Sequence, residues 1–322
     1  GTVSEIAEKL KLNPEKVRDQ DISGMTKGSI FYNKRNDHIH FATSIVNLTD
    51  FAIANPYYDK ETERRILDLV KAIRTCKEYL EGFGQDLIEE GKDQVVFRII
   101  PKWNAVKDIP GVMPCESLKD ILEENRDRIS TTRCLCRTTL RLGDCNSIEG
   151  TRPEEGHCGK LGEVAEFCVD GMGIGSYLTP EEMMVSLAKL DKLPYYHMIG
   201  NAREVKGGFC NCCSCCCDMR MGAKAAGDVK LGMLPSRFLA VIDEEKCIND
   251  QICIMSCPFF AMKYDQETEK VKIDDNKCMG CGTCVLACGQ DAIHIEIVRP
   301  ASYIPVTGPQ HIYESIHMGE EK

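Results

Sequence analysis

Cysteine is the residue that most constrains this chain: twenty of its 322 residues are cysteines, and most of them stand in tight runs. A secreted fold held by disulfides is usually short and follows a signal peptide. This chain begins GTVSEIAEKL, without a charged segment followed by an apolar run. We therefore expect a reducing, cytoplasmic setting, in which closely spaced cysteines serve as ligands of metals or metal clusters.

The last third of the chain contains an internal repeat. The segment 247–258 (CINDQICIMSCP) aligns without gaps on 278–289 (CMGCGTCVLACG), at a constant shift of 31 residues. The match continues downstream, where FFAMKY faces QDAIHI. Each half therefore predicts a cysteine loop, a short helix and an alternating strand, with a charged turn, QETE, between two of the strands.

This cysteine order, C-x2-C-x2-C-x3-C, resembles the bacterial two-cluster ferredoxin over residues 238–298. In that family the fourth cysteine of one run ligates the cluster of the other run. The resemblance implies a ferredoxin-like (βαβ)2 fold with two iron–sulfur clusters. Its expected iron ligands are Cys278, Cys281, Cys284 and Cys257 for a [4Fe–4S] cluster 1, and Cys247, Asp250, Cys253 and Cys288 for cluster 2. Glycines at positions 280 and 282 are expected to let backbone N–H groups approach the sulfur atoms.

Cluster 2 departs from the family pattern, because Asp250 stands where the second run has Cys281. A carboxylate is a harder ligand than a thiolate and binds such an iron less firmly. Two interpretations stay open. Either Asp250 is a conditional ligand of an iron that can be lost or exchanged from a [4Fe–4S] cluster, or it only caps the following helix and the cluster is a permanent [3Fe–4S] species.

Eleven further cysteines stand in the middle of the chain: Cys134, Cys136, Cys145, Cys158, Cys168, Cys210, Cys212, Cys213, Cys215, Cys216 and Cys217. One tetrahedral metal cannot bind all six thiols of the run FCNCCSCCC. Because side chains alternate in an extended segment, neighbours such as Cys212 and Cys213 serve different centres or one large centre. We favour one or two additional iron–sulfur clusters here, with structural zinc or a thiol redox or copper-buffering role as alternatives.

The expected fold class is α+β in five segments. They are a winged-helix-like region of two helices and a hairpin (1–50), a helical and mixed region (51–130), a cysteine-rich α/β cluster-binding region (131–237), the ferredoxin domain (238–298) and a tail (299–322). Within the third segment, Thr179 and Pro180 predict the start of a helix. This overall order resembles uncharacterised winged-helix-containing iron–sulfur proteins of anaerobic bacteria and archaea.

These patterns predict an electron-transfer protein or oxidoreductase subunit that relays electrons between redox partners in anaerobic metabolism. Two alternatives are a reductase with an unusual open-site cluster in the middle region, and a redox-sensing winged-helix regulator that binds DNA. From Ala240 to Lys322 the chain has seven basic and fourteen acidic residues. This balance disfavours DNA and favours a positively charged redox protein or oxidoreductase complex as partner. No stretch approaches about 18 apolar residues, so no membrane span is expected.

Overall fold

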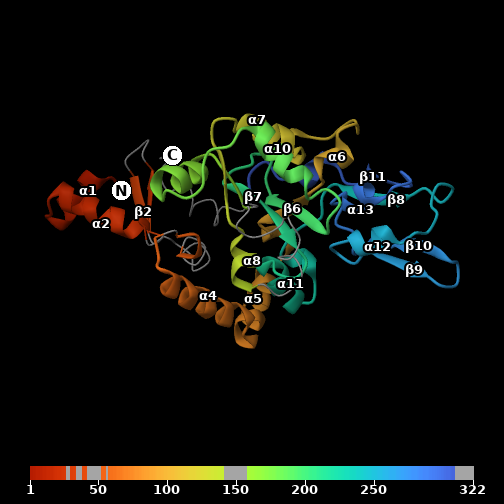
Figure 1. Cartoon of the computed structure of the whole chain (residues 1–322), viewed down its shortest axis with the longest axis horizontal. Coiled ribbons are helices and arrows are strands. Elements are labelled where there is room, and N and C mark those ends of the chain that lie inside the picture. The colour runs from red at the N-terminus through yellow and green to blue at the C-terminus, as the bar shows by residue number, and fades with distance from the viewer. Residues whose placement is uncertain (27–29, 34–37, 42–51, 56, 141–157, 309–322) are drawn as a thin grey trace.

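The computed structural model describes residues 1–26, 30–33, 38–41, 52–55, 57–140 and 158–308. Its elements follow one long axis, with helices α1 (Val3–Leu10) and α2 (Pro14–Thr26) at one end (Figure 1). Strands β8 (Phe238–Ile242) and β11 (Ile293–Ile297) lie towards the other end, and the largest sheet lies between. This mixture of helices and strands agrees with the expected α+β class.

The N-terminal segment has the expected order of two helices followed by a hairpin. A capping box starts α1, in which Thr2 and Glu5 exchange side-chain and backbone hydrogen bonds. Strands β1 (Ile30–Asn33) and β2 (His38–Phe41) then pair in antiparallel register. The assignment of this segment as a winged helix stays a prediction.

Two amphipathic helices follow, α4 (Lys60–Thr75) and α5 (Lys77–Glu90). Cys76 separates them, and its sulfur accepts the backbone N–H of Tyr79 at 3.4 Å as the N-cap of α5. Helix α5 packs on α11 (Asp218–Ala225). Among the residues that the structure describes, further α-helices before β8 are α6 (Trp103–Val106), α7 (Leu118–Glu124), α8 (Leu135–Leu140), α9 (Glu163–Glu166) and α10 (Pro180–Ala188).

The largest sheet has five antiparallel strands in the order β3-β6-β7-β5-β4. Their bounds are β3 (Phe97–Ile100), β4 (Ile129–Thr132), β5 (Cys158–Leu161), β6 (Tyr195–Gly200) and β7 (Gly208–Cys213). The sheet therefore takes strands from both of the regions expected at 51–130 and 131–237. Its register brings Cys158 opposite Cys210, and Tyr196 opposite Cys212.

The two faces of this sheet cover different parts of the molecule. One face, which includes Ile199 and Phe209, packs on helices α7 and α10. Helix α10 begins with a capping box between Thr179 and Glu182, as expected. The opposite face shares an apolar cluster with residues of the ferredoxin segment, among them Phe259, Met279 and Cys281. The sheet thus supports the ferredoxin segment directly.

The ferredoxin segment has the order expected from the repeat. Its elements are β8, α12 (Ile252–Ser256), β9 (Met262–Asp265), β10 (Lys270–Ile273), α13 (Thr283–Ala287) and β11. Strand β8 pairs with β11, and β9 pairs with β10. The shift of 31 residues maps α12 onto α13, so both halves fold alike. In the described part of the chain, no helix has the length and apolar character needed to cross a membrane.

Candidate metal centres

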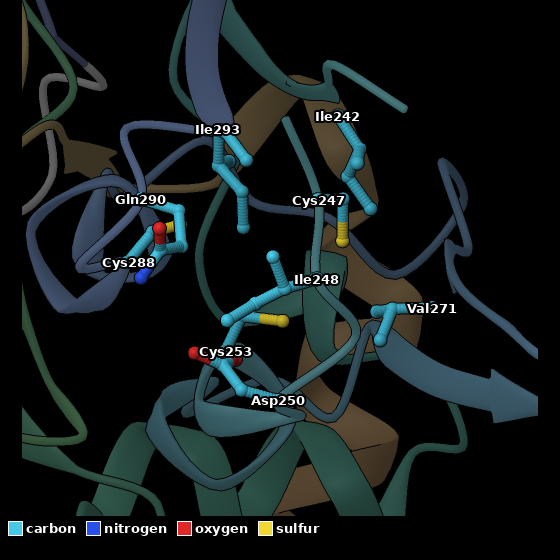
Figure 2. A pocket seen from close by; sticks show the side chains of 10 residues that line it. Ile242, Cys247, Ile248, Asp250, Cys253, Val271, Cys288, Gln290 and Ile293 are labelled. Atoms are coloured by element: carbon cyan, nitrogen blue, oxygen red, sulfur yellow. The ribbon is translucent and has the colours of Figure 1, made fainter. Parts of the chain in front are cut away.

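The four residues expected around cluster 2 line one pocket: Cys247, Asp250, Cys253 and Cys288. Figure 2 shows the sulfur atoms of Cys247 and Cys253 pointing into it, with Cys288 on the opposite side. Apolar side chains, including Ile248 and Ile293, complete the wall. The pocket therefore joins the first cysteine run to the last cysteine of the second run, as the family pattern implies.

Asp250 has two relations within this site. It lines the pocket, and one carboxylate oxygen accepts the backbone N–H of Ile252 at 3.1 Å at the start of α12. Its neighbours Asn249 and Gln251 have positive φ angles of 57° and 62°. Asp250 thus makes the helix-capping contact expected if the cluster is a permanent [3Fe–4S] species. Its side chain also lies beside the cysteines that are expected to bind iron. Whether Asp250 binds iron stays a prediction.

The four cysteines expected around cluster 1 line a second pocket: Cys257, Cys278, Cys281 and Cys284. The two pockets enclose about 330 Å³ and 340 Å³, including the open space at their mouths. Each pocket is lined by four potential ligand side chains, the number of protein ligands that such a cluster takes. Three of the cluster 1 cysteines are buried, whereas Asp250 of cluster 2 is exposed.

Hydrogen bonds point at the sulfur atoms of the cluster 1 pocket. The backbone N–H of Ala261 donates to Cys257 at 3.3 Å. Burial raises the pKa of Cys278, and hydrogen bonds from the backbone of Ala240 and Gly280 oppose this rise. Gly280 has the φ angle of 65° that glycine tolerates, and an added Cβ there would lie 2.2 Å from the hydroxyl of Ser236. The expected role of this glycine is present, together with a packing role that sequence did not predict.

Two buried residues beside cluster 1, Lys102 and Thr283, were not predicted from the sequence. The Thr283 hydroxyl lies 3.0 Å from the carbonyl oxygen of Tyr195 and 3.4 Å from the sulfur of Cys281. The backbone N–H of Lys102 donates to the carbonyl of Cys281 at 3.0 Å. The Lys102 ammonium is buried among the carbonyls of residues 190, 191 and 193, at 2.6, 2.6 and 3.1 Å. Burial lowers its pKa to about 8, against the opposing effect of Cys281.

Five of the middle cysteines interact with one another around β7, and we call them the sheet-face thiols. They are Cys134, Cys158, Cys210, Cys212 and Cys217. Three of the five, Cys210, Cys212 and Cys217, lie in the apolar cluster shared with the ferredoxin segment. Hydrogen bonds from Cys158 and Cys212 hold the pKa of Cys210 well below its ordinary value. The same contacts with Cys210 raise the pKa of both partners. These hydrogen bonds place the sulfur atoms of Cys158, Cys210 and Cys212 next to one another.

The other middle cysteines lie elsewhere. Cys213, Cys215 and Cys216 form a separate tight group. Cys168 is fully buried in an apolar cluster that contains no other described cysteine. Cys136 lies near Tyr79, whose pKa is about 12, raised first by burial and to a smaller extent by Cys136. Cys145 lies outside the described residues. The structure therefore distributes the middle thiols over several places in the fold.

A contact between two aromatic rings joins the sheet-face thiols to cluster 1. The pKa of Tyr196 is raised well above its ordinary value, first by burial and then by the charges of Cys217 and Cys212 beside its hydroxyl. Its ring lies 4.7 Å, centroid to centroid, from that of Phe259. Phe259 in turn lines the cluster 1 pocket. No pattern in the sequence indicated this contact, because the two rings are 63 residues apart.

The comparisons with known proteins agree with the ferredoxin part of this description. A search of the curated proteins found no significant match to the chain. Residues 239–289 match the family model described as a 4Fe-4S dicluster domain. The match covers both cysteine runs and therefore supports at least one [4Fe–4S] cluster and an iron–sulfur electron-transfer role. This segment of the chain is therefore similar to 4Fe-4S dicluster domains.

Proposed function

We propose that the chain is an iron–sulfur electron-transfer protein that relays electrons between redox partners through at least three clusters. The observation that carries the proposal is the pair of pockets, each lined by four ligand side chains from both halves of the repeat. Bound clusters supply one-electron oxidation and reduction. The residues of the chain hold the clusters, set the hydrogen bonds at their sulfur ligands and fix their spacing.

Cluster 1 is a [4Fe–4S] cluster held by Cys257, Cys278, Cys281 and Cys284. Cluster 2 is held by Cys247, Cys253 and Cys288, with Asp250 as a conditional fourth ligand. The exposure of Asp250 supports this difference, because an exposed carboxylate can exchange an iron for its hydrogen bond to Ile252. Cluster 2 is therefore [4Fe–4S] when Asp250 binds iron and [3Fe–4S] when it does not.

A third cluster binds at the sheet-face thiols. Their supply of five thiols from β5, β7 and the ends of neighbouring helices exceeds the four ligands that a cluster takes. The buried guanidinium of Arg137 supports an anionic centre here, because its pKa is raised by Cys134 against the lowering effect of burial. Arg137 also stacks over the ring of Tyr195, at 5.0 Å from its centroid, which holds the charge in place.

Tyr196 and Phe259 couple the third cluster to cluster 1. The two rings are 0% and 6% exposed, so the space between the centres is filled by protein and closed to solvent. The guanidinium of Arg220 lies 5.3 Å from the centroid of the Phe259 ring and adds a positive charge beside this contact. Packed aromatic side chains without intervening solvent support electron exchange between the two centres.

Cluster 2 exchanges electrons with the redox partner. Exposed apolar side chains surround its loop and α12: Ile248 is 63% exposed, Met255 75% and Phe260 65%. Exposed acidic residues, including Glu244 and Glu245, lie on the same connection between β8 and α12. An apolar patch with an acidic rim suits transient docking of a positively charged redox protein or oxidoreductase complex.

Counting iron and acid-labile sulfide in anaerobically isolated protein tests the proposal. We expect about eleven or more irons per chain, because three clusters are present and cluster 2 holds three or four. The double variant Cys158→Ser, Cys210→Ser should lose about four irons, and the matched variant Cys168→Ser should lose none. Colourless protein without sulfide would refute the proposal. A full complement at the two ferredoxin clusters with no further iron would remove the third cluster alone.

A further inference from the structure

Three thiols converge on the turn that follows β7. The sulfur atoms of Cys213 and Cys215 lie 3.5 Å apart, and those of Cys215 and Cys216 lie 3.7 Å apart. All three sulfur atoms are within 4.8 Å of one another. Residues 214–216 form the turn, so this group depends on one short stretch of backbone.

These distances match the ligand shell of a single metal ion. Zinc binds thiolate sulfur at about 2.3 Å in tetrahedral geometry, which separates two sulfur ligands by about 3.8 Å. The two measured separations are close to that value. Small side-chain rotations of Cys213 and Cys216 bring the third pair into the same range, because it starts below 4.8 Å.

The iron–sulfur pockets of this same molecule have wider spacing. In the described ranges, Cys213, Cys215 and Cys216 are the one group of three His, Cys, Asp or Glu side chains whose ligand atoms all lie within 4.8 Å. The ligands of the two ferredoxin pockets do not meet that condition. A cluster places an iron–sulfide core between its protein ligands, whereas a mononuclear site brings the ligands around one ion. The tight group therefore has the dimensions of a mononuclear site.

The surroundings also separate this group from the sheet-face thiols. Burial along β7 alternates, so Cys213 lies on the opposite face from Cys212. The apolar side chains that pack with the tight group are Leu140, Leu190, Leu193, Tyr195 and Met221. Cys213 and Cys216 are 5% and 0% exposed, whereas Cys215 is half-buried. A low-dielectric pocket with three soft ligands selects thiophilic ions.

We propose that Cys213, Cys215 and Cys216 bind one Zn²⁺ ion, separate from the iron–sulfur clusters. Three thiolates and Zn²⁺ carry a net charge of about −1. The guanidinium of Arg137 interacts with Cys213 and offsets this charge. The ion closes the turn between β7 and α11.

Zinc analysis of the whole, anaerobically isolated chain tests this site. We expect about one zinc per chain, and X-ray absorption at the zinc edge should report at least three sulfur neighbours at about 2.3 Å. In the double variant Cys215→Ser, Cys216→Ser, zinc should fall to background while the iron content stays at the wild-type value. The matched variant Cys76→Ser should retain both metals, because Cys76 lies at the N-cap of α5 and serine caps helices well.

Loss of about four irons from the double variant would overturn the proposal, because it would assign these thiols to a cluster. Copper instead of zinc in the wild-type chain, or zinc without sulfur neighbours, would also refute it. Retention of the ferredoxin absorption spectrum in the double variant establishes that the variant has folded. If the double variant does not fold, X-ray absorption at the zinc edge of the wild-type chain still tests the proposal, because it reports the zinc ligands directly.

Discussion

Replacing Thr283 by valine should lower the reduction potential of cluster 1. The side chain is fully buried, and its hydroxyl has one proton but two acceptors, the Tyr195 carbonyl at 3.0 Å and the Cys281 sulfur at 3.4 Å. When Cys281 is a cluster thiolate, the sulfur becomes the stronger acceptor. Reduction makes the cluster more negative, so a hydroxyl that donates to Cys281 stabilises the reduced state more than the oxidised state.

The size of this effect follows from the energy of one hydrogen bond. A hydrogen bond to a charged group contributes about 1.5 to 3 kcal/mol, and the difference between oxidation states is part of that. For a one-electron couple, about 1.4 kcal/mol corresponds to about 60 mV. We therefore expect Thr283→Val to lower the potential by tens of millivolts, with about 60 mV as the upper range.

Redox titration followed by electron paramagnetic resonance measures this shift in the intact protein. Thr283→Ser keeps the hydroxyl and should retain the wild-type potential, and cluster 2 serves as an internal reference in every sample. An unchanged cluster 1 potential in a folded Thr283→Val protein would refute the reasoning, because the hydroxyl would then donate to Tyr195 alone. A raised potential would mean that an oxygen lone pair faces the sulfur.

Three further predictions concern other parts of the molecule. Asp250→Cys should give a stable four-iron cluster 2, whereas Asp250→Asn keeps the helix cap and should leave three irons; identical spectra in both variants would show that this position does not face the cluster. Phe259→Leu should cost about 1 kcal/mol of stability and slow electron exchange between the third cluster and cluster 1, measured by rapid-mixing reduction, while Phe260→Leu on the exposed surface should not. Burial, and to a smaller extent the charge of Lys102, lowers the pKa of His197 in the folded chain to about 3. The imidazole of the unfolded chain takes up a proton near pH 6.5, so a fall in pH through this value favours the unfolded chain. Stability should therefore fall by about 1 kcal/mol between pH 7.5 and 5.5, and a His197→Gln variant in denaturant titrations should lack this part of the decrease.

The parts of the fold predicted from sequence are those set by local patterns. Thr179 and Pro180 predict the start of α10, and the structure has the capping box there. The repeat predicts two equivalent loop–helix–strand units, and each cysteine run converges on a pocket with the last cysteine of the other run. The alternation of side chains in an extended segment predicts that Cys212 and Cys213 diverge, which burial along β7 shows. In each case neighbouring residues alone determine the outcome.

The parts that sequence did not predict depend on contacts between distant segments. Cys158 meets Cys210 because β5 and β7 pair in one register, across 52 residues of chain. Lys102 is at the end of a strand, and its ammonium group finds three carbonyls that are 88 to 91 residues away. Nothing about an isolated lysine after a strand indicates a buried position. Residues of this kind can be recognised as part of the site only when the packing of the sheet on the ferredoxin segment is known.

The two halves of the ferredoxin repeat have the same backbone conformation in their cysteine loops but differ in the residues that pack on those loops. Gly280 and Gly282 have positive φ angles, and at the matching positions of the first half Asn249 and Gln251 adopt them as well. Backbone conformation alone therefore does not require glycine at these places. An added Cβ at Gly282 would lie 2.7 Å from the Cβ of Ala105, because the second loop packs against the region that precedes the ferredoxin segment. The first loop lies at the surface and can carry larger residues, which agrees with the proposal that cluster 2 is the cluster that contacts a partner.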